Sequence, residues 1–152
     1  MARAGFYAIS SSHIRFGRDG RWYSDGEPID NRRIANLFSR HIARHPEGGY
    51  QLTLGDEHAR IEVDDTPYVV VAVNDDTEGL TITLNDGSQE PLDPVSLRVA
   101  AGEVLYGNVK GGTERARFLR PAYYQLARFI EEEPPGRFYL RYRDTRHPIA
   151  RA

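Results

Sequence analysis

Apolar and polar residues alternate along most of this chain, and two longer stretches instead repeat about every three to four positions. The alternating runs predict short β-strands joined by tight turns, such as those at Asp19-Gly20 and Gly111-Gly112. The two longer stretches, about Asn31 to Arg44 and Pro121 to Ile130, predict helices with one apolar face each. A nearly unbroken β-branched run, Tyr68 to Val73, predicts a central strand that is covered on both faces. The pattern therefore predicts an α+β fold.

Part of the chain recurs 88 positions later without a gap. Asn31–Ile61 aligns with Leu119–Ile149, and eight of the 31 pairs are identical. The identical pairs lie where a helix followed by a hairpin needs them: Arg32/Arg120, Arg40/Arg128, Ile42/Ile130, Pro46/Pro134, Gly48/Gly136, Leu52/Leu140, Asp56/Asp144 and Ile61/Ile149. They predict two tandem halves of hairpin, helix and hairpin, with antiparallel sheets each packed by one helix. The alternative is chance similarity, since short α-β units share periodicity.

A polar segment with two prolines, Ser88 to Pro94, predicts the boundary between the halves. We expect an N-terminal α+β half with additional strands at residues 1–92 and a C-terminal α+β half at residues 93–152. With 152 residues, of which 39% are hydrophobic, the chain can bury one core or two small ones that share an interface.

Composition excludes several classes of protein. The chain has no cysteine, which rules out disulfides, thiolate zinc sites and a cysteine nucleophile. It has no apolar run long enough for a membrane span and no leader pattern, so we expect a cytoplasmic protein with no membrane partner. Of its 20 basic residues all but Lys110 are arginine. Either a GC-rich genome or selection for binding anions explains that bias.

Charge is distributed unevenly along the chain. Residues 56–93 hold 11 acidic side chains and one basic one, whereas residues 110–152 hold 10 basic and 5 acidic ones. The acidic middle either pairs with its basic flanks or leaves a basic groove between them. The net charge of −2 argues against broad binding of nucleic acid.

Three patterns resemble catalytic or metal sites, and none is complete. His41 and His45 have the spacing of metal ligands on a helix, but no third ligand is indicated. Residues 74–79 imitate half of a calcium loop, yet Asn85 occupies the position that requires a bidentate glutamate. Ser10–Ser12 beside a histidine lack a nucleophile elbow. We therefore expect no metal, no cofactor and no catalytic residue, although the fold could still bring carboxylates together.

The strongest chemical signal lies before the second predicted helix. Arg115 and Arg117 share one strand face by alternation, Lys110 precedes them, and Tyr123 and Tyr124 follow. Guanidinium groups near a helix N-terminus suit a phosphate or carboxylate, and the aromatic rings could stack on a base. The alternative is a row of arginines on a solvated strand face.

Several motifs together resemble those of the bacterial Domain of Unknown Function 1285 family. The resemblance runs from Ile14 to Ile149, in the order Arg18-Asp19-Gly20-x-Trp22, Gly26-x-Pro28-Ile29, Arg60-Ile61-Glu62-Val63-Asp64-Asp65-x-Pro67-Tyr68, Leu97-Arg98-Val99, Gly111-Gly112-x-Glu114-x-x-Arg117 and Arg120-Pro121-x-Tyr123-Tyr124-x-Leu126. The resemblance implies a duplicated α+β core whose second half is similar to a pleckstrin-homology domain. It also implies a ligand site, for something nucleotide-like, at the interface between the halves, and a role in signalling. The chain departs from the family at Arg143–Arg146, which puts ligand contacts from the last hairpin in doubt.

These observations lead to an expected function and two alternatives. We expect a non-enzymatic regulatory protein that binds a small anionic, nucleotide-like ligand between its halves. Its site would use Lys110, Arg115 and Arg117 for charge, Trp22 and Tyr123 for stacking, and Arg60 with Glu62 for the other wall. The first alternative is a protein-interaction module with no small-molecule ligand, and the second is an enzyme.

Overall fold

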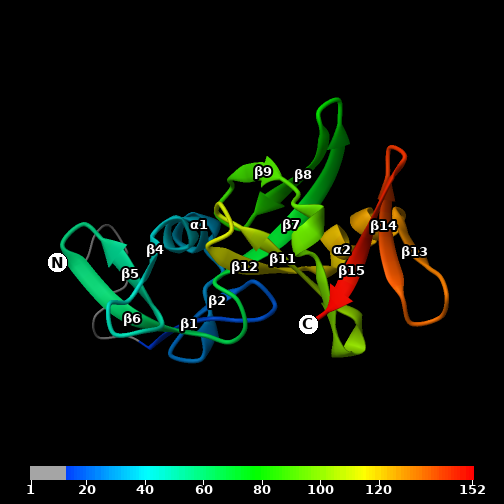
Figure 1. Ribbon diagram of the computed structural model, residues 1–152. Coiled ribbons are helices and arrows are strands. Elements are labelled where there is room, and N and C mark those ends of the chain that lie inside the picture. Colours follow the sequence, from blue (N-terminus) through cyan, green and yellow to red (C-terminus); the bar gives the residue numbers. More distant parts are fainter. Residues whose placement is uncertain (1–12) are drawn as a thin grey trace. The chain divides into compact units, whose positions relative to one another are not determined.

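In a computed structural model, which describes residues 13–152, the chain forms two compact units (Figure 1). The first comprises the described residues up to Pro67 together with Asn85–Gly87, and the second comprises Tyr68–Leu84 and Ser88–Ala152. The polar segment of residues 88–94, where the sequence predicts a boundary, lies within the second unit. Neither helix of residues 13–152 has the length and apolar character needed to cross a membrane.

A six-stranded sheet and one helix make up the first unit. Its strands run in the spatial order β3-β2-β1-β6-β5-β4, namely β3 (Glu27–Pro28), β2 (Trp22–Ser24), β1 (Ile14–Phe16), β6 (Glu57–Val63), β5 (Tyr50–Leu54) and β4 (Ile42–Arg44). Neighbouring strands are antiparallel except β1 and β6, which are parallel. A parallel pair needs a long crossover, and the helix and hairpin between β1 and β6 supply it.

The helix of the first unit, α1 (Arg32–Arg40), is shorter than predicted. It begins at Asn31, whose side-chain oxygen accepts hydrogen bonds from the backbone N–H groups of Arg33 and Ile34. It ends at His41, because the next residues, 42–44, pair with β5 as strand β4. The predicted helix to Arg44 is therefore wrong. His41 and His45 do not lie one turn apart on a helix.

Aromatic side chains fill the core of the first unit. The ring of Trp22 lies 4.8 Å from that of Phe16 and 5.5 Å from that of Phe38, measured between centroids. Trp22 is only 1% exposed, and its indole Nε1 donates a hydrogen bond to Oγ of Ser39 at 2.9 Å. The side-chain amide of Asn85 donates to the same Ser39 oxygen at 3.0 Å. This buried hydroxyl is thus satisfied on both sides.

The second unit contains a nine-stranded sheet and the helix α2 (Arg120–Ala127). The strands run in the order β13-β14-β15-β10-β11-β12-β7-β8-β9. They are β13 (Ile130–Glu132), β14 (Phe138–Tyr142), β15 (Thr145–Arg151), β10 (Arg98–Ala100), β11 (Val104–Val109), β12 (Glu114–Phe118), β7 (Tyr68–Asp76), β8 (Gly79–Leu84) and β9 (Gln89–Pro91). Two short 3-10 segments, η2 (Pro94–Ser96) and η3 (Ala101–Glu103), flank β10. Figure 1 shows the long hairpin of β7 and β8 in green.

Both sheets are mixed, so the fold is α+β but the predicted antiparallel sheets are wrong. In the second unit β10 pairs with β15 and β12 pairs with β7, both in parallel. The predicted central strand is confirmed, because β7 lies between β12 and β8. Pro121 lies in the first turn of α2, where its missing N–H costs no hydrogen bond. Ala122 and Leu126 of this helix are fully buried in the core of the unit.

The strand pairing of the first unit recurs in the second. At an offset of 88 residues, the pairs Ile42–Leu52, Tyr50–Ile61 and Leu52–Ala59 correspond to Ile130–Leu140, Phe138–Ile149 and Leu140–His147. At an offset of 83, the antiparallel pair Phe16–Trp22 corresponds to Val99–Leu105. The offset changes because the segment from β11 to α2 is longer than that from β2 to α1. Positions related in this way are called equivalent below.

Candidate functional site

A pocket of about 220 Å³ lies inside the second unit, between α2 and the sheet. Its lining is mainly apolar, with one tyrosine and two glutamates: Val99, Glu103, Leu105, Tyr123, Ala127, Ile130, Glu132, Phe138 and Ile149. Small-molecule sites in proteins have this composition, an apolar wall with a few polar groups that orient the ligand. For comparison, an engineered apolar cavity of about 150 Å³ holds benzene. The pocket therefore has room for a body about the size of one ring.

The floor of the pocket is made of side chains from two neighbouring rows on one face of the sheet. Glu132 pairs with Phe138, and Phe138 pairs with Ile149 on the next strand. Val99 pairs with Leu105 further along the same sheet. Directly paired residues share a face of the sheet. Strands β13, β14 and β15 and strands β10 and β11 therefore contribute side chains to one surface.

Two residues that line the pocket, Val99 and Leu105, form a strand pair that matches the pair Phe16–Trp22 of the first unit at an offset of 83. Leu105 is equivalent to Trp22, and Val99 is equivalent to Phe16. In the first unit these two aromatic rings pack together and against α1. Ala127 is equivalent to Ser39, which holds the Trp22 indole by a hydrogen bond. The second unit thus lacks both the ring and the hydroxyl that anchors it.

Tyr123 provides the polar group nearest the helix. It lies four residues before Ala127, so both face the pocket from adjacent turns of α2. Its hydroxyl donates a hydrogen bond to Oε1 of Glu103 at 3.3 Å. Burial raises the pKa of Tyr123 above its ordinary value of 10.0, and the negative charge of Glu103 raises it further. Tyr123 therefore stays neutral and acts as a hydrogen-bonding group.

Of the predicted site residues, Trp22 belongs to the core and cannot stack on a ligand. Its ring has no exposed face, and its N–H is already bonded to Ser39. Its place in the proposed site is therefore corrected. The cause is strand register: Trp22 pairs with Phe16 on the core face, and in a hairpin that pairing fixes which side chains point inward.

Arg60 and Glu62 lie on the opposite face of the same sheet from Trp22. Arg60 is exposed, and its guanidinium donates to the carbonyl oxygen of Gly48 at 3.1 Å. Glu62 pairs with His13, whose Nε2 lies 2.9 Å from Oε1 of Glu62. The structure therefore does not bring these two residues together with Trp22. Both are on strand β6 and remain accessible to a partner on that face.

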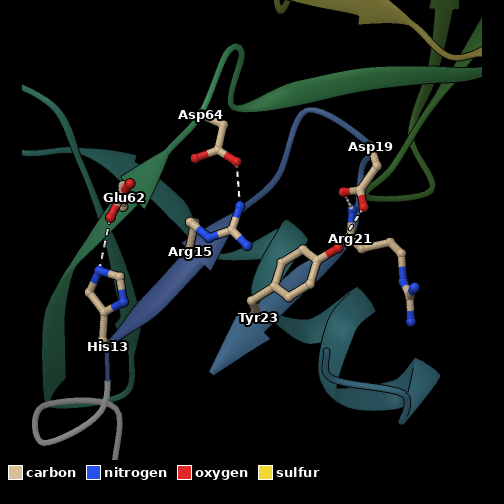
Figure 2. Close-up of polar contacts among 7 residues, drawn as sticks. All are labelled: His13, Arg15, Asp19, Arg21, Tyr23, Glu62 and Asp64. Carbon is tan, nitrogen blue, oxygen red and sulfur yellow. Dashed lines mark hydrogen bonds and ion pairs between the residues drawn. The ribbon is translucent and has the colours of Figure 1, made fainter. Parts of the chain in front are cut away.

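Figure 2 shows the polar network on that exposed face of the first unit. Arg15 forms an ion pair with Asp64, and its guanidinium lies 4.2 Å from the centre of the Tyr23 ring. Tyr23 in turn donates to Asp19 at 2.6 Å, and this hydrogen bond raises the pKa of Tyr23. Asp19 also accepts the backbone N–H of Arg21. The network rigidifies the first hairpin, and its charged groups are paired with one another.

Arg115 and Arg117 lie together, whereas Lys110 lies on the other side of the sheet. Arg117 pairs with Tyr106, and the Arg115 guanidinium lies 4.4 Å from the centre of the same ring. The Lys110 ammonium instead lies 4.9 Å from the centre of the Tyr68 ring. Tyr68 pairs with Ala116, the residue between the two arginines, so its side chain points to the opposite face. The structure groups the two arginines with Tyr106 and separates them from Lys110.

No metal site is found in residues 13–152, where no group of three or more His, Asp or Glu side chains is placed to hold an ion. The calcium-like segment, residues 74–79, covers the end of β7 and the turn into β8. There Asp76 accepts hydrogen bonds from the Glu78 backbone and from the Thr81 hydroxyl. Ser10–Ser12, considered as nucleophiles, lie outside the described residues.

Sequence reasoning found Tyr123 but missed the rest of the pocket. Glu103, Leu105, Ala127 and Glu132 belong to none of the motifs identified in the sequence. The signal that could have found them is the comparison of the two halves, which shows an aromatic residue replaced by leucine. That comparison aligns the first hairpin of each half at an offset of 83 residues. The gapless alignment at an offset of 88 residues begins only at Asn31 and does not include these hairpins.

The comparisons with known proteins confirm the resemblance seen in the sequence. Residues 7–66 match the family model described as domain of unknown function (DUF1285), N-terminal domain, so this part of the chain is similar to that domain. No curated protein matches the chain.

Two solved structures of DUF1285 family proteins are similar to the whole fold. The one from Silicibacter pomeroyi DSS-3 has a TM-score of 0.66 and 26% identity, and the match covers 91% of this chain and 80% of that one. The one from Shewanella baltica OS155 has a TM-score of 0.60 and 18% identity, and the match covers 78% of this chain and 92% of that one. The second likeness is one of fold alone.

Proposed function

We propose that this protein is a small-molecule-binding protein of bacterial cytoplasm whose ligand site is the pocket of the second unit. The observation that carries the proposal is the pocket itself, about 220 Å³ lined by apolar side chains with Tyr123 and two carboxylates. The pocket is open to solvent at the edge where Glu103 and Glu132 are exposed, so a small molecule can reach its apolar wall. A regulatory role would follow from ligand binding there.

The arrangement of the two units supports a history in which one pocket was opened. We infer that a hairpin, helix and hairpin unit was duplicated, because matching strand pairs recur at fixed offsets. After duplication, one copy kept Trp22 as its core and the other acquired Leu105 at the equivalent position. The likeness of the second unit to a pleckstrin-homology domain stays a proposal that rests on the family resemblance.

Methyl NMR tests the pocket directly, with benzyl alcohol as the probe. We expect benzyl alcohol to shift the methyl signals of Val99, Leu105 and Ile149 in a saturable way. The methyl signals of Ile14 and Leu52, which are fully buried in the first unit, serve as the internal control and should not move. If the pocket signals stay fixed at saturating probe, or if the control signals move equally, this pocket is not the binding site.

A second candidate function is anion binding on the arginine face of the sheet. The observation that favours it is the placement of Arg115 and Arg117 around the Tyr106 ring, a charged and aromatic surface that suits a nucleotide-like ligand. A thermal-shift screen with nucleotides tests it, since a ligand at a hundred times its Kd adds about 2.7 kcal/mol to stability. Substituting both arginines with alanine should abolish the shift, and the control Arg137→Ala, an exposed arginine, should not. An unchanged shift in the double variant would remove these residues from the site.

A further inference from the structure

The two carboxylates that line the pocket are not neutralised by basic side chains. Within residues 13–152, neither Glu103 nor Glu132 forms an ion pair, although both are exposed at the edge of the pocket. Their neighbour Glu131 shows the contrast. Its carboxylate lies 2.7 Å from Nε of Arg141 and 3.8 Å from Nε of Arg146. The chain thus pairs the glutamate on one face of β13 and leaves the one that faces the pocket without a countercharge.

Each of the two carboxylates is held in place by a single neutral donor. Glu132 accepts the backbone N–H of Gly136 through Oε2 at 2.8 Å, and Glu103 accepts the Tyr123 hydroxyl through Oε1. A carboxylate offers about four acceptor positions, so both keep capacity for a further donor. Glu103 also has a φ of 60°, a left-handed conformation that is unfavourable for a residue with a side chain. The fold therefore fixes both carboxylates without exhausting their hydrogen-bonding capacity.

We propose that the pocket binds a compact organic cation, namely a primary amine on an aliphatic or single-ring body. This inference rests on the proposed function and specifies its ligand class. The ammonium group would contact Glu103 or Glu132 at the pocket edge, and it offers three donors to the acceptors found there. The hydrocarbon body would fill the space beside Leu105 and Ile130. A phosphate or carboxylate ligand would meet a like charge at either glutamate.

Chemistry at the edge of the pocket supports a cation over a neutral ligand. Both carboxylates are near water, so a cation at either one gains the modest attraction of an exposed ion pair. The Tyr123 hydroxyl is already directed at Glu103, and its raised pKa keeps it protonated. The hydroxyl therefore stays a donor to one oxygen of Glu103 and carries no charge of its own, which leaves the other Glu103 oxygen to accept from a ligand.

Three probes of matched shape test the inference: benzylamine, benzyl alcohol and benzoate. They share a ring and differ in charge, so methyl shifts of Leu105 and Ile130 report which charge the pocket prefers. We expect benzylamine to bind about fivefold or more tightly than benzyl alcohol, and benzoate to bind most weakly. Added salt should weaken benzylamine binding and leave that of benzyl alcohol unchanged.

The outcomes separate this inference from the proposed function. If benzyl alcohol binds as tightly as benzylamine, the pocket is a ligand site without charge selection and the amine inference is overturned. If benzoate binds most tightly, the pocket prefers an anion and the amine inference is overturned. If none of the three probes shifts the pocket signals, the proposed function falls and the inference falls with it.

Two isosteric variants identify the groups responsible, and a third is the matched control. Glu103→Gln and Glu132→Gln remove charge and keep the shape of the side chain, so each should reduce the preference for benzylamine over benzyl alcohol. The double variant should abolish the preference. Glu131→Gln, one position from Glu132 but on the other face of β13, should leave the preference unchanged. A preference that survives the double variant, or that is lost equally in Glu131→Gln, contradicts the assignment.

Discussion

The indole Nε1 of Trp22 donates a hydrogen bond to Oγ of Ser39 at 2.9 Å, within the core of the first unit. At offsets of 83 and 88 residues, the second unit has Leu105 and Ala127, which line the pocket and have neither the ring nor the hydroxyl. Under the proposed duplication, this pair of differences separates a filled core from a pocket. Exchanging the residues at these positions between the two units tests that proposal.

Opening the first unit should cost stability. Trp22→Leu removes a fully buried ring and leaves the hydroxyl of Ser39 with one partner fewer, so we expect the free energy of unfolding to fall by about 2–4 kcal/mol. Urea denaturation followed by far-ultraviolet circular dichroism measures it, because Trp22 is the only tryptophan and fluorescence is lost in the variant. A loss below about 1 kcal/mol would show that the ring is not a main part of this core.

Filling the second unit should abolish ligand binding without unfolding the protein. The double variant Leu105→Trp with Ala127→Ser recreates the indole and hydroxyl pair of the first unit inside the pocket. We expect benzyl alcohol and benzylamine to lose their effect on the remaining pocket methyl signals, while the thermal unfolding midpoint stays the same or rises. The single variant Leu105→Trp leaves its N–H without the serine oxygen and should be about 1–2 kcal/mol less stable than the double variant. Equal stability of the two would argue against an equivalent geometry.

The titration of Tyr123 gives a prediction about pH. Its folded-state pKa is raised, so the folded state holds the tyrosine proton to higher pH than the unfolded state does. The stabilisation is fully present below the unfolded pKa of about 10 and is lost as pH rises through the folded pKa. In Tyr123→Phe the free energy of unfolding should fall less as pH rises above about 10. The difference between the ultraviolet absorbance titrations of the wild type and of this variant identifies the Tyr123 signal. Glu103→Gln should bring the pKa of Tyr123 only part of the way back to its ordinary value, because burial of the ring is the larger cause of the shift.

The ion pairs of Glu131 should contribute little to stability. The side chains of Arg141 and Glu131 are 53% and 39% exposed, and exposed pairs contribute about 0–1 kcal/mol. We therefore expect Glu131→Gln to change the free energy of unfolding by less than about 1 kcal/mol, and the change to shrink in high salt. Chemical denaturation at low and high salt measures it. A larger, salt-independent change would mean that Glu131 has a structural role beyond these pairs.

Turns and strands were predictable from the sequence because local chemistry decides them. The Asp19-Gly20 and Gly111-Gly112 turns join antiparallel strands as expected, and the β-branched run from Tyr68 is a central strand. Helix ends were less predictable. Ile42 fits the apolar face of a continued helix as well as it fits a strand, and its pairing with Leu52 decides for the strand. That partner is distant in sequence, so helical periodicity alone could not reveal it.

The site was predictable only where one residue carried a local signal. Tyr123 was proposed as a ring that stacks on a ligand because it follows Arg115 and Arg117 near the helix start; it lines the pocket, and its stacking role stays a prediction. Trp22 was misassigned because a lone tryptophan beside a turn fits a stacking role as well as a core role, and only strand register separates them. Glu103 and Leu105 matter through what surrounds them in space, which composition and spacing do not encode. The use of Arg60 and Glu62 in ligand binding stays a prediction, as does that of Arg115 and Arg117, whereas Lys110 lies on the other face of the sheet from the two arginines.

The path of the chain between Pro67 and Ser88 limits how this protein can be divided. Residues 68–84 belong to the second unit, yet the next three residues, Asn85–Gly87, belong to the first. A protease nick or a split gene at residue 67 would therefore give a shorter piece in which Ser39 lacks the amide of Asn85. Neither unit is one uninterrupted length of polypeptide, so recombination at a single point in the gene cannot transfer either unit whole.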